Sequence, residues 1–243
     1  MEDIDAIAAL QDPVRRRLYE YVAAQGREVG RNEAAEAAGV ARTLAAHHLD
    51  RLTDAGLLES GSRRLTGRSG PGAGRPAKVY TRARTERAVS LPARDYRTAA
   101  ELLAEAAEEA GLDAGLFAAA HRRGEALRAA GVPCGGLTEA VEVLAARGYE
   151  PYWEAADRGP DAGGGRAADG GDADREAGAA ARVIRMRNCP FHAVAEHFPP
   201  LVCGMNLALL QGLFGEGGPV RARLDPRPGE CCAVVEDSKT NDH

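Results

Sequence analysis

The apolar residues of the first ninety positions recur at the spacing of three helices followed by a β-hairpin. The first helix follows Asp12, which can cap it, and Pro13, whose fixed φ suits a first helical turn. A second helix over residues 32–38 is expected to be capped by Asn32 and to end at Gly39, which can take a positive φ. The packing face of the first helix is formed by Val14, Leu18, Tyr21 and Val22.

A third helix, predicted over residues 41–55, separates apolar from polar side chains. Its inward stripe consists of Ala45, His48, Leu49 and Leu52. Gly56 ends the helix, and a strand begins at Leu57 and Leu58. A segment rich in Gly and Pro follows before Val79 and Tyr80 return. Helix, turn, helix and hairpin in this order predict a winged helix-turn-helix domain.

The outward side of the third helix carries Arg42, Thr43, Ala46, His47 and Asp50, mostly in the half that meets base edges in such domains. Residues 63–87 hold eight Arg or Lys and one acid, although the whole chain has a net charge of -5. Such a local positive charge suits phosphate neutralisation, although single arginines there can also be solvated charges. The predicted DNA-binding residues are Arg42, Thr43, His47, Arg51, Arg63, Arg64, Arg68, Arg75 and Lys78.

Over roughly residues 9–84 the chain resembles the winged helix-turn-helix regulators of the ArsR type. The resemblance rests on the segments QDPVRRRLYEYV, VARTLAAHHLDRLTDAGLLE and GRPAKVYTRA. It implies a transcriptional regulator that binds a double-stranded DNA operator. A homodimer would place two recognition helices on half-sites one helical turn apart.

The length of 243 residues leaves room for a second domain after the short linker at Leu91 and Pro92. Residues 1–92 carry a net charge of +3 and residues 93–243 carry -8, so the positive charge is segregated. The sequence has no apolar run of membrane-spanning length and no signal segment, which predicts a cytoplasmic protein without a membrane partner. We therefore predict a DNA-binding domain over 1–92 and a sensor and dimerisation domain over 93–243.

The second domain begins with two Ala- and Glu-rich helices over residues 94–111 and 112–131, which form a helical linker. The apolar stripe of Leu102, Leu103 and Ala106 suits either a dimer contact or packing within one protomer. A mobile loop is expected at about 157–178, where apolar residues are scarce. The remaining pattern predicts helices over 137–147, 191–197 and 201–214 and strands over 149–153, 182–189, 220–224 and 231–235. The fold class is therefore α+β, with a small sheet in the second domain.

Four of the five cysteines fall near predicted element ends, where side chains from separate elements can converge. Cys189 ends a strand, Cys203 begins a helix, and Cys231 and Cys232 open the last strand. In a cytoplasmic chain we expect thiols or metal ligands rather than structural disulfides. Thiolates suit iron-sulfur clusters, Zn and Cu(I) alike. Cys134 lies apart in a predicted loop and fits no pattern.

This arrangement is similar to that of the SufR-type regulators, whose sensor domain holds an iron-sulfur cluster. The resemblance implies such a cofactor, for example a 4Fe–4S cluster, with Cys189, Cys203 and Cys232 as the first, second and fourth ligands. The stretch 216–219, where the third cysteine is expected, has none. His192 and Cys231 are the candidates for the remaining ligand. Zinc held by three cysteines and His192, or no metal at all, are the alternatives.

The predicted function is a DNA-binding transcriptional regulator, acting as a repressor, whose cysteine-bearing domain senses iron-sulfur or redox status. The alternative is a regulator without metal that binds a small molecule between the helices of residues 191–214. An enzyme would need Cys189 as nucleophile and His192 as base. The sequence offers no residue to orient that base and no oxyanion donor, so we predict no catalysis.

Overall fold

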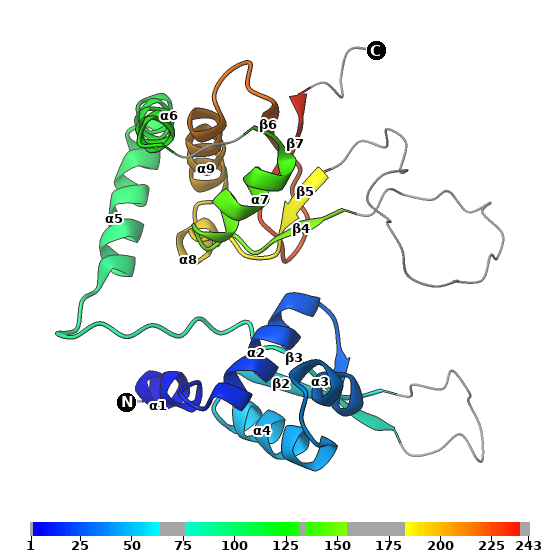
Figure 1. The fold of residues 1–243 in the computed structure, drawn as a ribbon. Helices are drawn as coiled ribbons and strands as arrows, with labels where there is room; N and C mark the ends of the chain where they lie inside the picture. The colour runs from blue at the N-terminus through cyan, green and yellow to red at the C-terminus, as the bar shows by residue number, and fades with distance from the viewer. Residues whose placement is uncertain (1, 64–75, 132–134, 155–182, 239–243) are drawn as a thin grey trace. The chain divides into compact units, whose positions relative to one another are not determined.

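The computed structural model describes residues 2–63, 76–131, 135–154 and 183–238. The chain divides into two compact units, Met1–Arg94 and Asp95–His243 (Figure 1). This division lies two residues after the one expected from the sequence. The predicted loop at 157–178, Cys134 and the residues 64–75 between the wing strands lie outside the described part of the chain.

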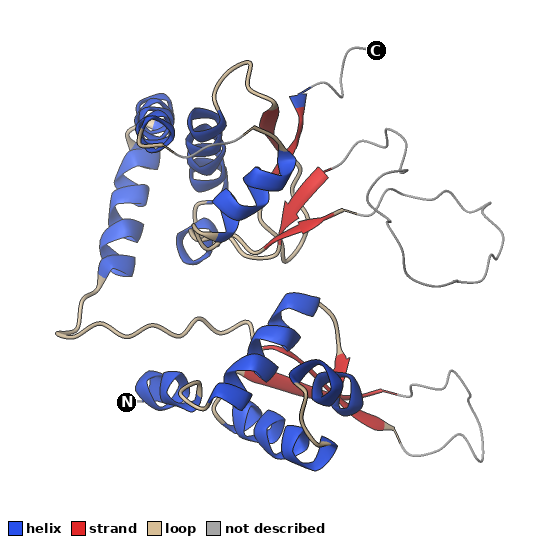
Figure 2. Cartoon of the chain, in the orientation of Figure 1, coloured by secondary structure: helices blue, strands red, loops and turns tan. Residues whose placement is uncertain are grey.

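The first unit contains helices that precede a β-hairpin (Figure 2). Strands β1, β3 and β2 form an antiparallel sheet in that order, with Leu58 opposite Arg82 and Arg63 opposite Ala77. The predicted order of helix, turn, helix and wing is confirmed, whereas α1 and the two-residue β1 were not predicted. The elements are α1 (Glu2–Ala9), α2 (Pro13–Gln25), β1 (Val29–Gly30), α3 (Arg31–Ala38), α4 (Arg42–Asp54), β2 (Leu58–Arg63) and β3 (Ala77–Arg82).

Local chemistry explains where these helices begin and end. The Asp12 side chain accepts hydrogen bonds from the backbone N–H groups of Val14 and Arg15 at 2.9 and 3.0 Å, as predicted for a cap. The prediction for Asn32 is wrong, because α3 already begins at Arg31 and Gly30 caps it without a side-chain bond. The core of this unit includes Leu18, Val22, Ala45, Leu49, Leu52, Leu58 and Tyr80.

The second unit combines a four-stranded antiparallel sheet, in the order β4-β5-β7-β6, with helices packed on it. Helix α9 lies between α6 and the sheet (Figure 1). The mixture of helices and strands confirms the α+β class, with ends shifted from the predicted ones by a few residues. The elements are α5 (Tyr96–Glu109), α6 (Asp113–Ala129), α7 (Leu137–Ala145), β4 (Pro151–Trp153), β5 (Val183–Met186), α8 (His192–Ala195), α9 (Pro199–Phe214), β6 (Val220–Leu224) and β7 (Ala233–Asp237).

Two glycines allow α6 and α9 to approach each other closely. A Cβ atom added to Gly124 would lie 2.2 Å from the carbonyl oxygen of Leu209. One added to Gly212 would lie 2.1 Å from the carbonyl oxygen of His121. Since no side chain fits at either place, the two helices are in backbone contact.

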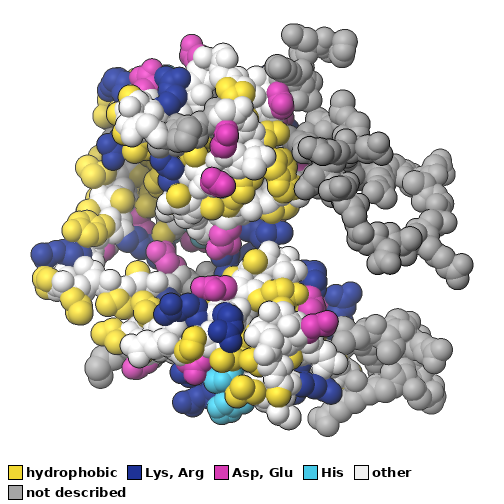
Figure 3. Space-filling model, in the orientation of Figure 1, with side chains coloured by type: hydrophobic (Ala, Val, Ile, Leu, Met, Phe, Trp, Pro, Cys, Tyr) yellow, Lys and Arg dark blue, Asp and Glu magenta, His cyan; other side chains and the backbone are white. Residues whose placement is uncertain are grey.

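Helix α5 presents apolar residues to its surroundings rather than to the core. Tyr96, Leu102 and Leu103 are 73, 60 and 72% exposed, and α5 has no buried residue. Figure 3 shows hydrophobic side chains along this helix. Packing of Leu102 and Leu103 within one protomer, one of the two expectations for this stripe, is therefore not what the structure has. Among the described residues, none of the helices meets the length and apolarity needed to cross a membrane.

Candidate functional site

The outward face of α4 offers the predicted base-reading side chains to solvent. Arg42, Thr43, His47 and Arg51 are all exposed, while Ala45, Leu49 and Leu52 on the other side are fully buried. Thr43, His47 and Arg51 are spaced by four residues, so they follow one ridge of the helix. None of these four side chains has an ion-pair partner among the described residues. Figure 3 shows histidine side chains beside Lys and Arg over this helix.

Two cations on the wing strands are instead paired with acids of the same unit. Arg63 on β2 lies 3.4 Å from a carboxylate oxygen of Glu28, and Lys78 Nζ on β3 lies 2.7 Å from Asp50 Oδ1. Their charges are therefore partly balanced before DNA approaches. Three further predicted contacts, Arg64, Arg68 and Arg75, lie outside the described residues.

Asp50 links α4 to the start of α3 and to the wing. Besides Lys78, it accepts a hydrogen bond of 2.7 Å from the hydroxyl of Tyr80, and Arg31 lies 3.3 Å away. The Asp50 side chain is 42% exposed, as expected for the outward side of the helix, but these internal partners occupy its carboxylate. Burial alone raises the pKa of Asp50, but the hydrogen bonds from Lys78 and Tyr80 outweigh it and hold that pKa below its usual value. Burial, with the bond to Asp50, raises the pKa of Tyr80 to about 12.

A groove of about 1130 Å³ lies between the start of α3, the N-terminal end of α4 and the wing strands. It is lined by more cations than acids, and two of the cations, Arg31 and Lys78, belong to the Asp50 network. This surface adjoins the exposed face of α4 and suits phosphate groups of a DNA backbone. The charged lining residues are Arg27, Arg31, Arg42, Arg63 and Lys78, with Glu28 and Glu33 as the acids.

In the second unit, the structure brings together four cysteines from three segments. Cys189 follows β5, Cys203 lies in the second turn of α9, and Cys231 and Cys232 directly precede β7. The Cys231 sulfur is within hydrogen-bond reach of the thiols of Cys189 and Cys232, and Cys232 is within reach of Cys203. The predictions that Cys203 begins a helix and that the vicinal pair opens a strand are each displaced by a few residues.

Several donors point at these sulfurs. The backbone N–H of Phe191 donates to Cys189, and that of Ala233 donates to Cys231. Asn206 Nδ2 also lies 3.3 Å from the Cys231 sulfur. Hydrogen bonds from the neighbouring thiols are the main reason that the pKa of Cys231 is lowered, whereas the pKa values of Cys189 and Cys232 are raised because these thiols donate to it. Cys231 is also the most buried of the four, at 2% exposed.

His192, the other candidate for the remaining ligand, points elsewhere. Its side chain is 65% exposed, and Nε2 lies 3.1 Å from a carboxylate oxygen of Glu196. The described residues contain no group of three or more His, Cys, Asp or Glu side chains arranged for a single metal ion. The donor set of four thiols, with N–H groups aimed at sulfur, suits the thiolate ligands of an iron-sulfur cluster, of zinc and of Cu(I) alike.

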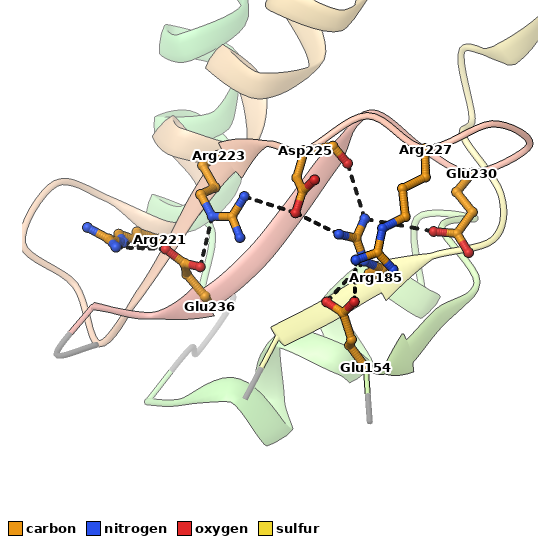
Figure 4. A network of polar contacts seen from close by, with 8 residues as sticks. All are labelled: Glu154, Arg185, Arg221, Arg223, Asp225, Arg227, Glu230 and Glu236. Atoms are coloured by element: carbon orange, nitrogen blue, oxygen red, sulfur yellow. Dashed lines mark hydrogen bonds and ion pairs between the residues drawn. The ribbon is translucent and has the colours of Figure 1, made fainter. Parts of the chain in front are cut away.

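A network of ion pairs fixes the loop that leads to Cys231. Arg185 on β5 is 1% exposed and lies 2.6 Å from Asp225, 3.1 Å from Glu154 and 3.8 Å from Glu230 (Figure 4). The backbone N–H of Cys231 donates to the carbonyl of Met186 on the same strand. The eight residues drawn in Figure 4 comprise four arginines and four acids, so their charges balance and they leave no surplus for an ionic ligand.

Sequence reasoning missed several residues that hold these sites in place. Tyr80 and Arg31 support α4, Asn206 and Tyr149 lie beside the cysteines, and Arg185 holds the loop that leads to Cys231. A polar residue inside an otherwise apolar helix, such as Asn206 in PPLVCGMNLALLQGLF, is the one signal that was available. Buried polar residues need partners, and that need points to a local network.

A family model described as a helix-turn-helix domain matches residues 10–61. Comparisons with curated proteins and with solved structures gave no match. The matched segment runs from the start of α2 into β2 and covers about a fifth of the chain. It supports a DNA-binding transcriptional regulator of the winged helix-turn-helix type.

Proposed function

We propose that this DNA-binding regulator is a homodimeric repressor whose second unit senses iron-sulfur or redox status through an iron-sulfur cluster. The observation that carries the proposal is the meeting of Cys189, Cys203, Cys231 and Cys232 from three segments of a unit joined to a helix-turn-helix domain. A bound cluster would supply a group that oxygen or iron shortage can alter.

The cysteines would connect three elements of the second unit. Cys189 extends β5, Cys203 belongs to α9, and the vicinal pair ends the loop between β6 and β7. Thiolates bound to one cluster would hold these elements in one arrangement, and loss of the cluster would release them. A change in their arrangement could bias the geometry of a dimer and thus its fit to two half-sites.

We propose that the exposed face of α5 packs against the same helix of a second copy of the chain. Leu102 and Leu103 are more than half exposed, and a lone winged helix reads only one half-site of an operator. Leu103→Glu should therefore convert a dimer to a monomer in sedimentation equilibrium. Leu112→Glu, a change at another exposed leucine, should leave the dimer intact. A monomeric wild-type protein would refute this part of the proposal.

The cofactor is tested on full-length protein purified without air. Iron, acid-labile sulfide and visible absorbance are measured together with DNA binding before and after exposure to oxygen. We expect iron and sulfide in the wild type, loss of both in Cys189→Ser and Cys203→Ser, and altered DNA binding after oxidation. Cys134→Ser is the matched control and should retain the cluster.

The proposal would be overturned if the protein contained no iron or sulfide and its DNA binding did not change on exposure to oxygen. Zinc in place of iron would assign the cysteines to a structural site. A small molecule that changes DNA binding of the metal-free protein would favour the alternative of a ligand-responsive regulator.

A further inference from the structure

A fully buried amide on α9 faces the cysteines. Asn206 is 0% exposed and follows Cys203 by three residues, so both side chains lie on the same side of the helix. Its Nδ2 atom is 3.3 Å from the sulfur of Cys231. Helix α9 thus brings one thiol and one hydrogen-bond donor to the same group of sulfurs.

Tyr149 fixes the orientation of this amide. The Tyr149 hydroxyl oxygen lies 2.5 Å from Asn206 Oδ1, and Tyr149 itself is 2% exposed. The Tyr149 hydroxyl is the donor in this bond and Oδ1 is the acceptor. The NH₂ group of Asn206 is then directed at Cys231 as a donor.

A neutral thiol is a weak hydrogen-bond acceptor. A hydrogen bond to it therefore offsets little of the free energy that is lost when an amide is removed from water. A thiolate is a much better partner, because a hydrogen bond to a charged acceptor is stronger. The thiolate is also the form of cysteine that binds metals. A purely structural Asn206 would need no charge on the sulfur, and this difference can be tested.

We infer that Cys231, rather than His192, completes the thiolate set of Cys189, Cys203 and Cys232, and that Asn206, oriented by Tyr149, is its positioning residue. This inference rests on the proposed iron-sulfur function. A donor to a ligand sulfur stabilises the more negative, reduced state of a cluster, so Asn206 would raise its reduction potential.

The test uses full-length protein purified without air, with Cys231→Ser, His192→Ala, Asn206→Leu and Tyr149→Phe as variants. Leu matches the size of Asn but cannot donate, and Phe removes only the hydroxyl. Iron and sulfide per chain, the visible circular dichroism spectrum, the rate of iron loss to a chelator and the reduction potential are measured. Urea unfolding followed by Trp153 fluorescence establishes that each variant is folded.

We expect Cys231→Ser to lose iron and sulfide or to change the spectrum, and His192→Ala to match the wild type. Asn206→Leu should retain a cluster with a lower reduction potential and about tenfold weaker retention of iron. Tyr149→Phe should shift both quantities in the same direction by less. If Asn206→Leu does not fold, the shift in Tyr149→Phe decides the role of the pair.

Two results would overturn the inference while leaving the proposed function in place. One is a Cys231→Ser protein with an unchanged spectrum and iron content. The other is an unchanged reduction potential and iron retention in folded Asn206→Leu and Tyr149→Phe. A wild-type protein without iron and sulfide would overturn the inference and the proposed function together.

Discussion

Asp50 in the first unit and Arg185 in the second are each the centre of an ion-pair network, with the signs reversed. The side chain of Asp50 is 42% exposed and contacts two cations, whereas Arg185 is 1% exposed and contacts three acids. Solvent screens the first network, and the second lies where an unpaired charge is costly. The same kind of contact therefore sets the charge offered to DNA in one unit and the position of a loop in the other.

The largest expected effect comes from Arg185→Met, which leaves Glu154, Asp225 and Glu230 without their buried partner. We expect a loss of about 3–5 kcal/mol in the free energy of unfolding of the second unit. Trp153 is the single tryptophan of the chain, so its fluorescence during urea unfolding reports on this unit. Arg221→Met, at a 38% exposed site of the same network, should cost under about 1 kcal/mol. Equal losses in both variants would contradict the contrast between buried and screened networks.

The side chains of α4 that no ion pair occupies should determine base preference. Thr43→Ala or His47→Ala should change the preferred base at one operator position, by about 1–3 kcal/mol. Arg63→Ala should weaken binding to all sequences and flatten the dependence on salt concentration. Selection from a randomised operator library, followed by binding measurements at several salt concentrations, separates the two effects. A change of preference in Arg63→Ala alone would move the recognition surface from α4 to the wing.

Asp50→Asn tests whether the exposed network restrains the positive surface of the first unit. The amide can still accept from Tyr80, so we expect a loss of about 1 kcal/mol or less in unfolding free energy. Arg31 and Lys78 are no longer neutralised, so binding to non-specific DNA should tighten and its salt dependence should steepen. Asp54→Asn, an equal charge change at an exposed site of α4, is the control. If both variants tighten DNA binding equally, net charge rather than the network explains the result.

The smallest effect concerns His48, whose Nδ1 is buried and has no hydrogen-bond partner among the described residues. Burial lowers the pKa of His48 below its ordinary value of 6.5. As the pH falls, His48 is therefore protonated at a higher pH in the unfolded chain than in the folded protein. His48 should contribute fully to stability above pH 6.5 and progressively less below it. Thermal unfolding by circular dichroism should show this slope in the wild type and a flatter one in His48→Gln. A steeper slope in the variant would reverse the sign of the argument.

The sequence was sufficient for the elements that depend on local patterns. Apolar spacing and the glycines at 39 and 56, with φ of 66 and 68°, marked α3, α4 and the wing. The cysteine positions at element ends suggested convergence, and the structure brings each of those four thiols near at least one other. The burial of Arg185 and the partners of Asp50 depend on residues nineteen or more positions away, so local patterns did not reveal them. From the sequence alone, a charged residue in a strand is expected to be exposed, because the sequence does not show which loop covers it.

The backbone contact at Gly124 and Gly212 determines how movement can pass through the second unit. Ordinary helix pairs are separated by a layer of side chains that can change rotamers and absorb a small shift. Here the carbonyl oxygens of one helix meet the glycine of the other, so no such layer exists at the crossing. A displacement of α9 at Cys203 would therefore be carried to α6 as the movement of one rigid piece rather than dissipated between the two helices.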